Sequence, residues 1–339
     1  MRSGSGKKEG GWTRRQFLIA TVGGSIFLGA GLGLLQRLRS RNIKAEVFIG
    51  RVPGYSSNIA AKIQEGFREL GILPEEIRGK RILLKPNLVE TNPGMTHINT
   101  NPLVIRGAIE AFKGCGAEEV LVAEGPGHCR DSRLLIEESG LAEVLREDRI
   151  RFVDLNYDDV YSIPNSGGWS GLKELMLPQT LRGVDWVVSM PKMKTHHWAG
   201  VTLSMKNMFG LMPGIYYGWP KNVLHVAGIP EAILDINATV KPHLAIVDGI
   251  VGMEGDGPIM GDPRHVGVLI IGRNFCAVDA TCSRVMGINP QKVKYLKAAD
   301  NRIGTIYEND IFQRGETIAS VRTQFALVDK IPAHKGIRL

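Results

Sequence analysis

Short apolar runs alternate with amphipathic segments along most of this chain, and that alternation restricts its fold more than any other feature. Apolar runs within 81–85, 119–123 and 185–190 predict buried strands, and apolar residues at helical spacing between them predict helices. Strands that are apolar on both faces are typical of parallel sheets covered by helices on each side. The sequence therefore predicts an α/β fold, with a mostly parallel, Rossmann-like sheet, helices on both faces and room for a smaller second lobe.

The same patterns extend the prediction over the rest of the chain. We expect further strands at 45–52, 151–154, 243–247 and 266–271. We expect helices at 59–70, 101–113, 131–146, 201–212, 230–238, 275–286 and 290–299. The segment 157–178 is punctuated by Gly, Ser and Pro, which indicates an inserted lobe or a lid. Near the end of the chain, 318–328 is predicted to form one or two strands.

The first 41 residues differ in charge from everything that follows them. The chain of 339 residues carries a formal net charge of +8, and residues 1–41 contribute most of it, with eight basic side chains against one acidic one. The rest is nearly neutral and lacks the concentrated Lys and Arg surface that binding to a phosphate backbone requires. We therefore expect no nucleic-acid partner, and a chain of two parts: residues 1–41 and an α/β body over 44–330.

Residues 1–41 are predicted to act as an address rather than as part of the fold. Arg14-Arg15 followed by Phe17-Leu18 resembles the twin-arginine (Tat) export signal, and the uncharged run 17–35 is long enough for a helix to cross a bilayer. A plain transmembrane anchor is the alternative, and an uncleaved signal would combine both. We expect the Tat machinery as a partner, and a body exported to the extracytoplasmic face of the membrane and tethered there through 17–35.

Cysteine spacing limits the cofactors that the chain can hold. The sequence contains Cys115, Cys129, Cys276 and Cys282. None of them belongs to a C-x-x-C pair, so we expect neither a zinc ribbon nor an iron–sulfur cluster. A disulfide framework is not expected at so low a cysteine density. The prediction is that these cysteines act as small buried apolar side chains.

The strongest polar cluster directly follows the predicted strand at 185–190. It consists of Lys192, Lys194, Thr195, His196 and His197. Ligands of such sheets bind beyond the carboxyl ends of the strands. We therefore predict that the two lysines hold an anion or act as base or nucleophile, that the histidines are acid–base groups or metal ligands, and that the threonine binds substrate. The alternative is a solvated basic loop with one histidine in the core.

Two further polar residues lie in the predicted helix at 201–212. We predict that Lys206 is catalytic and that Asn207 binds substrate, although their spacing leaves open whether they face a cleft or water. The buried stripe of that helix is predicted to consist of Met205, Met208 and Met212.

Polar residues also follow two other predicted strands. Lys85 and Asn87 come at the end of the strand at 81–85, and Glu124 and His128 come after the strand at 119–123. Because the carboxyl ends of parallel strands meet at one edge of the sheet, we predict that all four residues bind substrate. Ordinary turns that use Asn, Pro and Gly for conformational reasons are the alternative.

Carboxylates in a glycine-rich stretch indicate a cation site. Asp248 ends a predicted strand, and Glu254 and Asp256 follow in the loop after it. Carboxylate oxygens are the ligands of Mg²⁺ and Ca²⁺, so these three residues are predicted to hold a divalent metal ion; the alternative is a flexible acidic loop. Asp279 lies within an apolar helix and is predicted to be a buried carboxylate with a raised pKa, unless a lysine pairs with it.

These segments together resemble the family known as domain of unknown function 362. The resemblance is carried by Ile82-Leu83-Leu84-Lys85-Pro86-Asn87, Asn99-Thr100-Asn101-Pro102, Glu124-Gly125-Pro126-Gly127, Pro191-Lys192-Met193-Lys194-Thr195-His196-His197, Lys206-Asn207-Met208-Phe209-Gly210 and Asp248-Gly249. It covers roughly residues 44–300. The resemblance implies no particular activity. Other members often carry a ferredoxin-like cysteine cluster, which this sequence lacks, so it implies no electron-transfer role here.

The sequence therefore favours an exported or membrane-tethered α/β enzyme that binds an anionic small molecule, with a divalent metal ion as a candidate cofactor and an unknown reaction. The alternative is a non-catalytic accessory protein that holds a metal or cofactor for a membrane redox complex.

Overall fold

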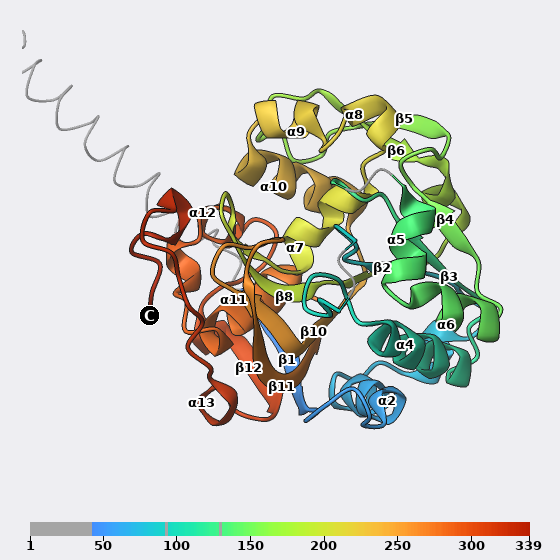
Figure 1. Cartoon of the computed structure of the whole chain (residues 1–339), viewed down its shortest axis with the longest axis horizontal. Coiled ribbons are helices and arrows are strands. Elements are labelled where there is room, and N and C mark those ends of the chain that lie inside the picture. Colours follow the sequence, from blue (N-terminus) through green and yellow to red (C-terminus); the bar gives the residue numbers. More distant parts are fainter. Residues whose placement is uncertain (1–42, 92–93, 129–130) are drawn as a thin grey trace, which may run out of the picture. The chain divides into compact units, whose positions relative to one another are not determined.

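A central sheet of ten strands runs through the described part of the chain (Figure 1). The computed structural model describes residues 43–91, 94–128 and 131–339, and Ile43–Leu339 forms a unit of its own. The main path of the sheet has the order β12 (Ile311–Gly315), β1 (Ala45–Arg51), β11 (Asp262–Gly272), β10 (Leu244–Glu254), β7 (Trp186–Met190), β2 (Arg81–Pro86), β3 (Glu119–Glu124), β4 (Phe152–Asp154). Beside this path, β8 (Lys192–His196) pairs with β10 and with β9 (Gly200–Thr202).

Most neighbouring strands of this sheet run parallel. From β10 through β7, β2 and β3 to β4 every pair is parallel, and β1 is parallel to β12. The exceptions are β11, which is antiparallel to both β1 and β10, and the β8–β9 pair. The prediction of an α/β fold with a mostly parallel sheet is confirmed.

Helices cover both faces of the sheet, and this explains why central strands such as β2 and β7 are buried on both faces. The covering helices include α2 (Ile59–Glu69), α4 (Pro102–Gly114), α10 (Ile229–Val240), α11 (Phe275–Val285) and α12 (Lys294–Ala299). In β2, Leu83 belongs to the core that contains α10, α11 and α12 residues, whereas Ile82 and Leu84 belong to the core that contains α2 and α4 residues. Successive side chains of a strand point to opposite faces, so each face of β2 must be apolar.

Two predicted segments are built differently from the expectation. The single helix predicted at 131–146 is divided into α5 (Ser132–Glu138) and α6 (Leu141–Glu147), because Gly140 between them has a φ of +76°, which a helix cannot continue through. The predicted lobe or lid at 157–178 is a hairpin of β5 (Val160–Pro164) and β6 (Glu174–Pro178) that forms its own two-stranded sheet.

Two other predictions are wrong. The predicted helix at 201–212 begins as β9 and continues as the short α7 (Ser204–Asn207) and a 3₁₀ turn, η2 (Met208–Leu211). The predicted strands at 318–328 are absent from the structure: α13 (Ile318–Val321) occupies part of that range, and the last strand is β12, which precedes it. β12 lies at the sheet edge beside β1, and Ile311 is the only one of its five residues that is buried.

The predicted export signal, with its apolar run at 17–35, lies outside the described residues. Among the residues that the structure does describe, no helix is long and apolar enough to cross a membrane. Cys276 and Cys282 are buried free thiols in the core, as predicted, and Cys115 is a partly buried free thiol. Cys129 lies outside the described residues.

Candidate functional site

A cavity of about 170 Å³ opens beyond the carboxyl ends of β2 and β3. Its position follows from the topology, since β2 and β3 are parallel neighbours whose last residues meet at one edge of the sheet. Its polar lining includes Lys85, Glu124, His196, Lys206, Lys221 and His225. Apolar groups, among them Phe209 and Pro220, line the rest.

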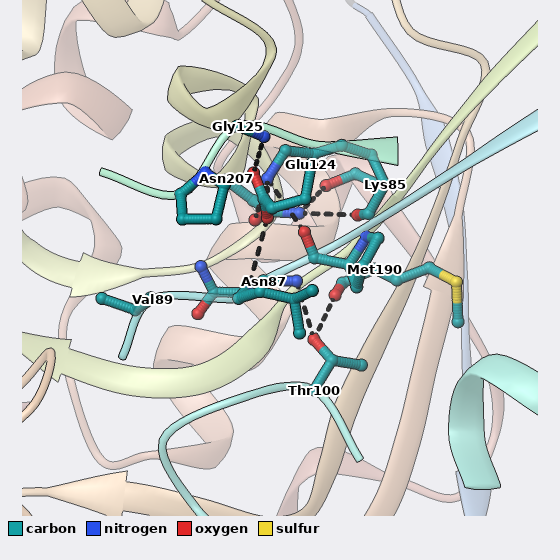
Figure 2. A network of polar contacts seen from close by, with 12 residues as sticks. Lys85, Asn87, Val89, Thr100, Glu124, Gly125, Met190 and Asn207 are labelled. Atoms are coloured by element: carbon teal, nitrogen blue, oxygen red, sulfur yellow. Dashed lines mark hydrogen bonds and ion pairs between the residues drawn. The ribbon is translucent and has the colours of Figure 1, made fainter. Parts of the chain in front are cut away.

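The floor of the cavity is a buried ion pair (Figure 2). Lys85 Nζ donates to Glu124 Oε2 at 2.7 Å, to the carbonyl oxygen of Pro86 at 2.9 Å and to Asn207 Oδ1 at 3.0 Å. Both oxygens of Glu124 also accept backbone N–H groups, from Leu88 at 3.0 Å and from Gly125 at 2.9 Å. Burial lowers the pKa of Lys85, and the Glu124 carboxylate opposes that shift. Each charge of the pair is therefore compensated within the protein.

Asn207 connects the ion pair to strands β2 and β7 by hydrogen bonds. Its Nδ2 donates to the carbonyl oxygen of Lys85 and to Ser189 Oγ, both at 3.1 Å. Asn207 is buried, so it supports the ion pair by hydrogen bonds and does not face bulk water. Asn87 also lines the cavity, and its Oδ1 is a buried acceptor without a hydrogen-bond partner among the described residues.

Two glycines let the loops around the ion pair approach it closely. Gly125 N donates to the carbonyl oxygen of Gly210 at 2.9 Å. A Cβ at Gly210 would collide with Glu124 Oε1 and with Lys85 Nζ, and a Cβ at Gly125 would lie 2.8 Å from the Gly210 oxygen. Gly125 and Gly210 are therefore explained by the lack of space for a side chain at the floor of the cavity.

Lys206 differs from Lys85 because its charge is not compensated. Its Nζ lies 4.1 Å from the centre of the Phe209 ring, a cation–π contact, and no described residue accepts a hydrogen bond from it. Burial and the positive charge of Lys85 lower the pKa of Lys206 to about 8, with Glu124 opposing them. The sequence left open whether Lys206 faces a cleft or water, and the structure shows that it lines the cavity. Met205, Met208 and Met212, which lie near Lys206 in the sequence, are buried in the core, as predicted.

Lys221 is a second cavity lysine, and the sequence analysis missed it. Its Nζ donates to the carbonyl oxygen of Met212 at 2.6 Å and to Asn156 Oδ1, so neither partner is a carboxylate. Burial is the main cause that lowers the pKa of Lys221 to about 7. The residue has a φ of +73° and precedes the short α9 (Asn222–Val226). It lies in a loop to which we assigned no element, and nothing in its local spacing distinguishes it from a surface lysine.

Two histidines of the cavity have opposite tautomers. His196 Nδ1 accepts the backbone N–H groups of Trp198 at 3.0 Å and Ala199 at 3.3 Å, so in the neutral ring Nε2 carries the proton. His225 Nδ1 lies 2.9 Å from the carbonyl oxygen of Lys221 and must donate to it, which leaves Nε2 as an acceptor. Burial and the charge of Lys206 lower the pKa of both rings, with the larger shift at His196. Sequence reasoning did not single out His225.

The other two predicted histidines lie at the margin of the cavity. His197 is partly exposed, with Nδ1 3.6 Å from Asp256 Oδ1. His128 is exposed and contacts the carboxylate of Glu90 through Nδ1. Trp198, more than half exposed, stacks edge-on against His225 and forms part of the cavity wall.

Three residues of the predicted Lys-x-Lys-Thr cluster lie outside the cavity lining. Lys192 Nζ forms a fully buried ion pair with Asp248 Oδ2 at 2.6 Å, and Tyr55 bonds to both partners. Lys194 Nζ donates to the carbonyl oxygens of Ile98 at 2.8 Å and Pro258 at 3.1 Å.

Lys194 and Thr195 both hold the loop after β10. Thr195 Oγ1 donates to the carbonyl oxygen of Gly255 at 2.8 Å, and Pro258 of the same loop lines the cavity. Burial and the nearby charge of Lys192 lower the pKa of Lys194 well below its ordinary value. The two side chains therefore shape one wall of the cavity from behind.

The three predicted metal ligands are held by separate partners. Asp248 pairs with Lys192, Glu254 Oε2 accepts the backbone N–H of Ala326 at 2.8 Å, and Asp256 lies near His197. Within residues 43–91, 94–128 and 131–339, no group of three or more His, Cys, Asp or Glu side chains is gathered as a metal site would require. The divalent ion stays a prediction.

Asp279 of α11 supports the site from a distance. Its two carboxylate oxygens accept the backbone N–H groups of Ser204 at 2.7 Å and Met205 at 3.1 Å, and Tyr295 donates to it at 3.2 Å. Burial raises the pKa of Asp279 to about 7, while these hydrogen bonds oppose the shift. Asp279 is buried as predicted, and its role is to hold the first turn of α7, which carries Lys206.

Comparison of the chain with known proteins assigns it to a family. The chain matches the family described as domain of unknown function 362 (DUF362) over residues 82–284. It is 29% identical over 233 residues to the thylakoid-associated protein sll1697 of Synechocystis. This alignment covers 67% of this chain and 68% of that protein. A solved structure from Thermotoga maritima, a structural genomics target, is 15% identical with a TM-score of 0.37; the match covers 66% of this chain and spans only 58% of that one.

Proposed function

The chain belongs to the DUF362 family, and we propose that its body is an enzyme whose cavity binds a small anionic molecule and exchanges protons with it. The observation that carries this proposal is the charge of the cavity. Lys206 and Lys221 both line it, and no described carboxylate forms an ion pair with either lysine. The one buried carboxylate of the lining, Glu124, is already paired with Lys85.

An anion in the cavity would supply the missing partner. An ammonium group taken out of water without a counter-charge is costly, and the pKa values of the partly buried Lys206 and the buried Lys221 are both lowered for that reason. His196 Nε2–H adds a neutral hydrogen-bond donor on the same lining. The volume of about 170 Å³ is below the range of drug-sized pockets, which favours a ligand of a few heavy atoms.

Proton exchange is proposed from the same groups. A catalytic acid or base works best when its pKa lies near the working pH, and the pKa of Lys206 is about 8. His225 offers an unprotonated Nε2 beside it, because its Nδ1–H is bound to a carbonyl oxygen. One group can thus donate a proton and the other accept one at neutral pH.

The test is ligand-dependent thermal stability of the full chain with sodium pyruvate, a carboxylate, and with inorganic phosphate as probes. A ligand that binds the folded state raises the melting temperature, and the stabilisation grows with the logarithm of its concentration once that exceeds Kd. We expect such a rise with at least one probe, and expect it to be lost in Lys206→Met and reduced in Lys221→Met. The matched control is Lys297→Met, an exposed lysine of α12. No rise with either probe, or equal rises in all variants, would contradict the proposal.

We also propose that residues 1–41 direct the body to the extracytoplasmic face of a membrane by the Tat route and tether it there. The support is the Arg14-Arg15 pair and the uncharged run at 17–35. The Synechocystis relative is named for its association with thylakoids, which agrees with a membrane-associated location.

A further inference from the structure

We propose that Lys206 forms an imine with the carbonyl carbon of a 2-oxo acid, which names small carbonyl carboxylates as the ligand class of the cavity. The inference rests on the proposed anion site and deepens it, because binding an anion needs no covalent bond. Four features of the cavity lead to it: a free amine, a means of keeping that amine neutral, a proton acceptor and a second cation for the carboxylate.

The first feature is the availability of the Lys206 nitrogen. Its Nζ is in contact with the Phe209 ring and donates to no described acceptor. Three buried lysines have their nitrogens occupied: Lys85 and Lys192 by carboxylates, and Lys194 by two carbonyl oxygens. Lys206 is therefore the lysine among these four whose nitrogen can approach a ligand carbon without first giving up a hydrogen bond.

The second feature is the environment that favours a neutral amine. Desolvation next to another cation is the arrangement that activates lysine as a nucleophile. Lys206 lines a partly apolar cavity whose floor holds the ammonium group of Lys85. The resulting pKa of about 8 leaves a usable fraction of free amine near neutral pH, whereas an ordinary lysine has almost none.

The third and fourth features are the neighbouring groups. His196 and His225 line the same cavity as Lys206, and the His225 ring lies edge-on to Phe209, whose ring Lys206 Nζ contacts, with 5.9 Å between the two ring centres. His225 Nε2 can accept a proton, and His196 Nε2–H can donate a hydrogen bond to a carbonyl oxygen. Lys221 uses two of its N–H groups on Asn156 and Met212, and the third is left for a carboxylate.

The chemical step balances without a further reactant. The Lys206 amine attacks the carbonyl carbon, a C–N bond forms, and the π electrons of the C=O bond move to oxygen, which is held by His196 Nε2–H. His225 takes a proton from the new ammonium group and returns it to that oxygen. In the resulting carbinolamine His225 moves the second amine hydrogen from nitrogen to the hydroxyl group, the C–O bond breaks and water leaves, so that a C=N bond joins the 2-oxo acid to Lys206.

Reductive trapping tests the imine directly. The full chain is incubated with pyruvate, 2-oxobutyrate or 3-hydroxypyruvate, each with sodium cyanoborohydride, which delivers hydride to the imine carbon and makes the bond permanent. Intact mass and peptide mapping then locate the adduct. We expect one adduct per chain with at least one of the three acids, on the peptide that contains Lys206, and expect added pyruvate without reductant to raise the melting temperature.

Lys206→Arg is the decisive variant, because arginine keeps the positive charge but cannot form an imine under these conditions; Lys297→Arg is its surface control. The proposal expects the adduct to vanish in Lys206→Arg and to persist in Lys297→Arg. A wild type whose melting temperature rises with pyruvate but which gives no adduct with any of the three acids overturns the imine and leaves the anion site standing. An adduct that persists in Lys206→Arg also overturns it. No thermal response to pyruvate or phosphate and no adduct overturns both proposals.

Discussion

Single residues decide whether the charges at the floor of the cavity can come together. Gly210 is the clearest case, since the space that a side chain would need is filled by Glu124 Oε1 and Lys85 Nζ. The Lys85–Glu124 pair is buried and fully hydrogen-bonded, so it cannot be displaced without exposing two charges to an apolar interior. The ion pair can therefore form in this geometry only because position 210 has no side chain.

We predict that Gly210→Ala lowers the free energy of unfolding by about 1–3 kcal/mol, the usual cost of forcing extra atoms into a packed site. The matched control is Gly183→Ala, where an added Cβ meets nothing within 4 Å. That change should leave stability within about 1 kcal/mol of the wild type or raise it slightly. Urea unfolding curves measure both. Equal stabilities of the two variants would show that the floor is not as tightly packed as the structure has it.

At the level of elements, the short helix α7 depends on a carboxylate from α11. Four residues cannot form a stable helix by themselves, so the backbone N–H groups of α7 need an external partner. Asp279 supplies it by accepting from Ser204 and Met205. The residue after Met205 is Lys206, so the hydrogen bonds from Asp279 also fix the position of the Lys206 backbone at the cavity.

The raised pKa of Asp279 has a defined consequence for stability. A carboxyl group whose folded-state pKa of about 7 exceeds its ordinary value of 3.8 stabilises the fold fully at low pH and loses that contribution as pH rises through this window. The free energy of unfolding of the wild type, measured relative to Asp279→Asn, should therefore fall between about pH 4 and pH 7 and level off above. Its slope cannot exceed about 1.4 kcal/mol per pH unit. A difference that stays constant over this range, or rises, contradicts the assignment.

At the scale of the whole molecule, the fold could be predicted from the sequence far better than the site. Alternating apolar strands and amphipathic helices are local patterns, so β2, β3 and β7 and the covering helices were predictable, whereas the antiparallel insertion of β11 depends on pairing between distant segments. The position of Glu124 followed from strand-end reasoning, whereas the sequence left open whether Lys206 faces a cleft or water. The positions of Lys221 and His225 were not predicted, because the loop that brings them to the cavity has no periodic pattern.

The proposed location is also a property of the whole molecule. We predict that the full chain is recovered in the membrane fraction of its native host, on the side accessible to externally added protease, and that Arg14→Lys with Arg15→Lys keeps it in the cytoplasm. A variant that begins at Ile43 should leave the membrane fraction, since the body has its own two hydrophobic cores. Export of the double lysine variant at the wild-type level would contradict the Tat route, and membrane recovery of the shortened chain would contradict the tether.

The proposed anion site depends most on the uncompensated charge of Lys206, and the pKa of this group can be measured directly. NMR spectra of the chain labelled with ¹⁵N at lysine Nζ, recorded as pH is raised and assigned with Lys206→Arg, give the pKa of this one group. We predict a pKa of about 8 in the free protein and a higher value when inorganic phosphate is added. A pKa near the ordinary lysine value of 10.5 that phosphate leaves unchanged would contradict the central claim that this cavity is an anion site.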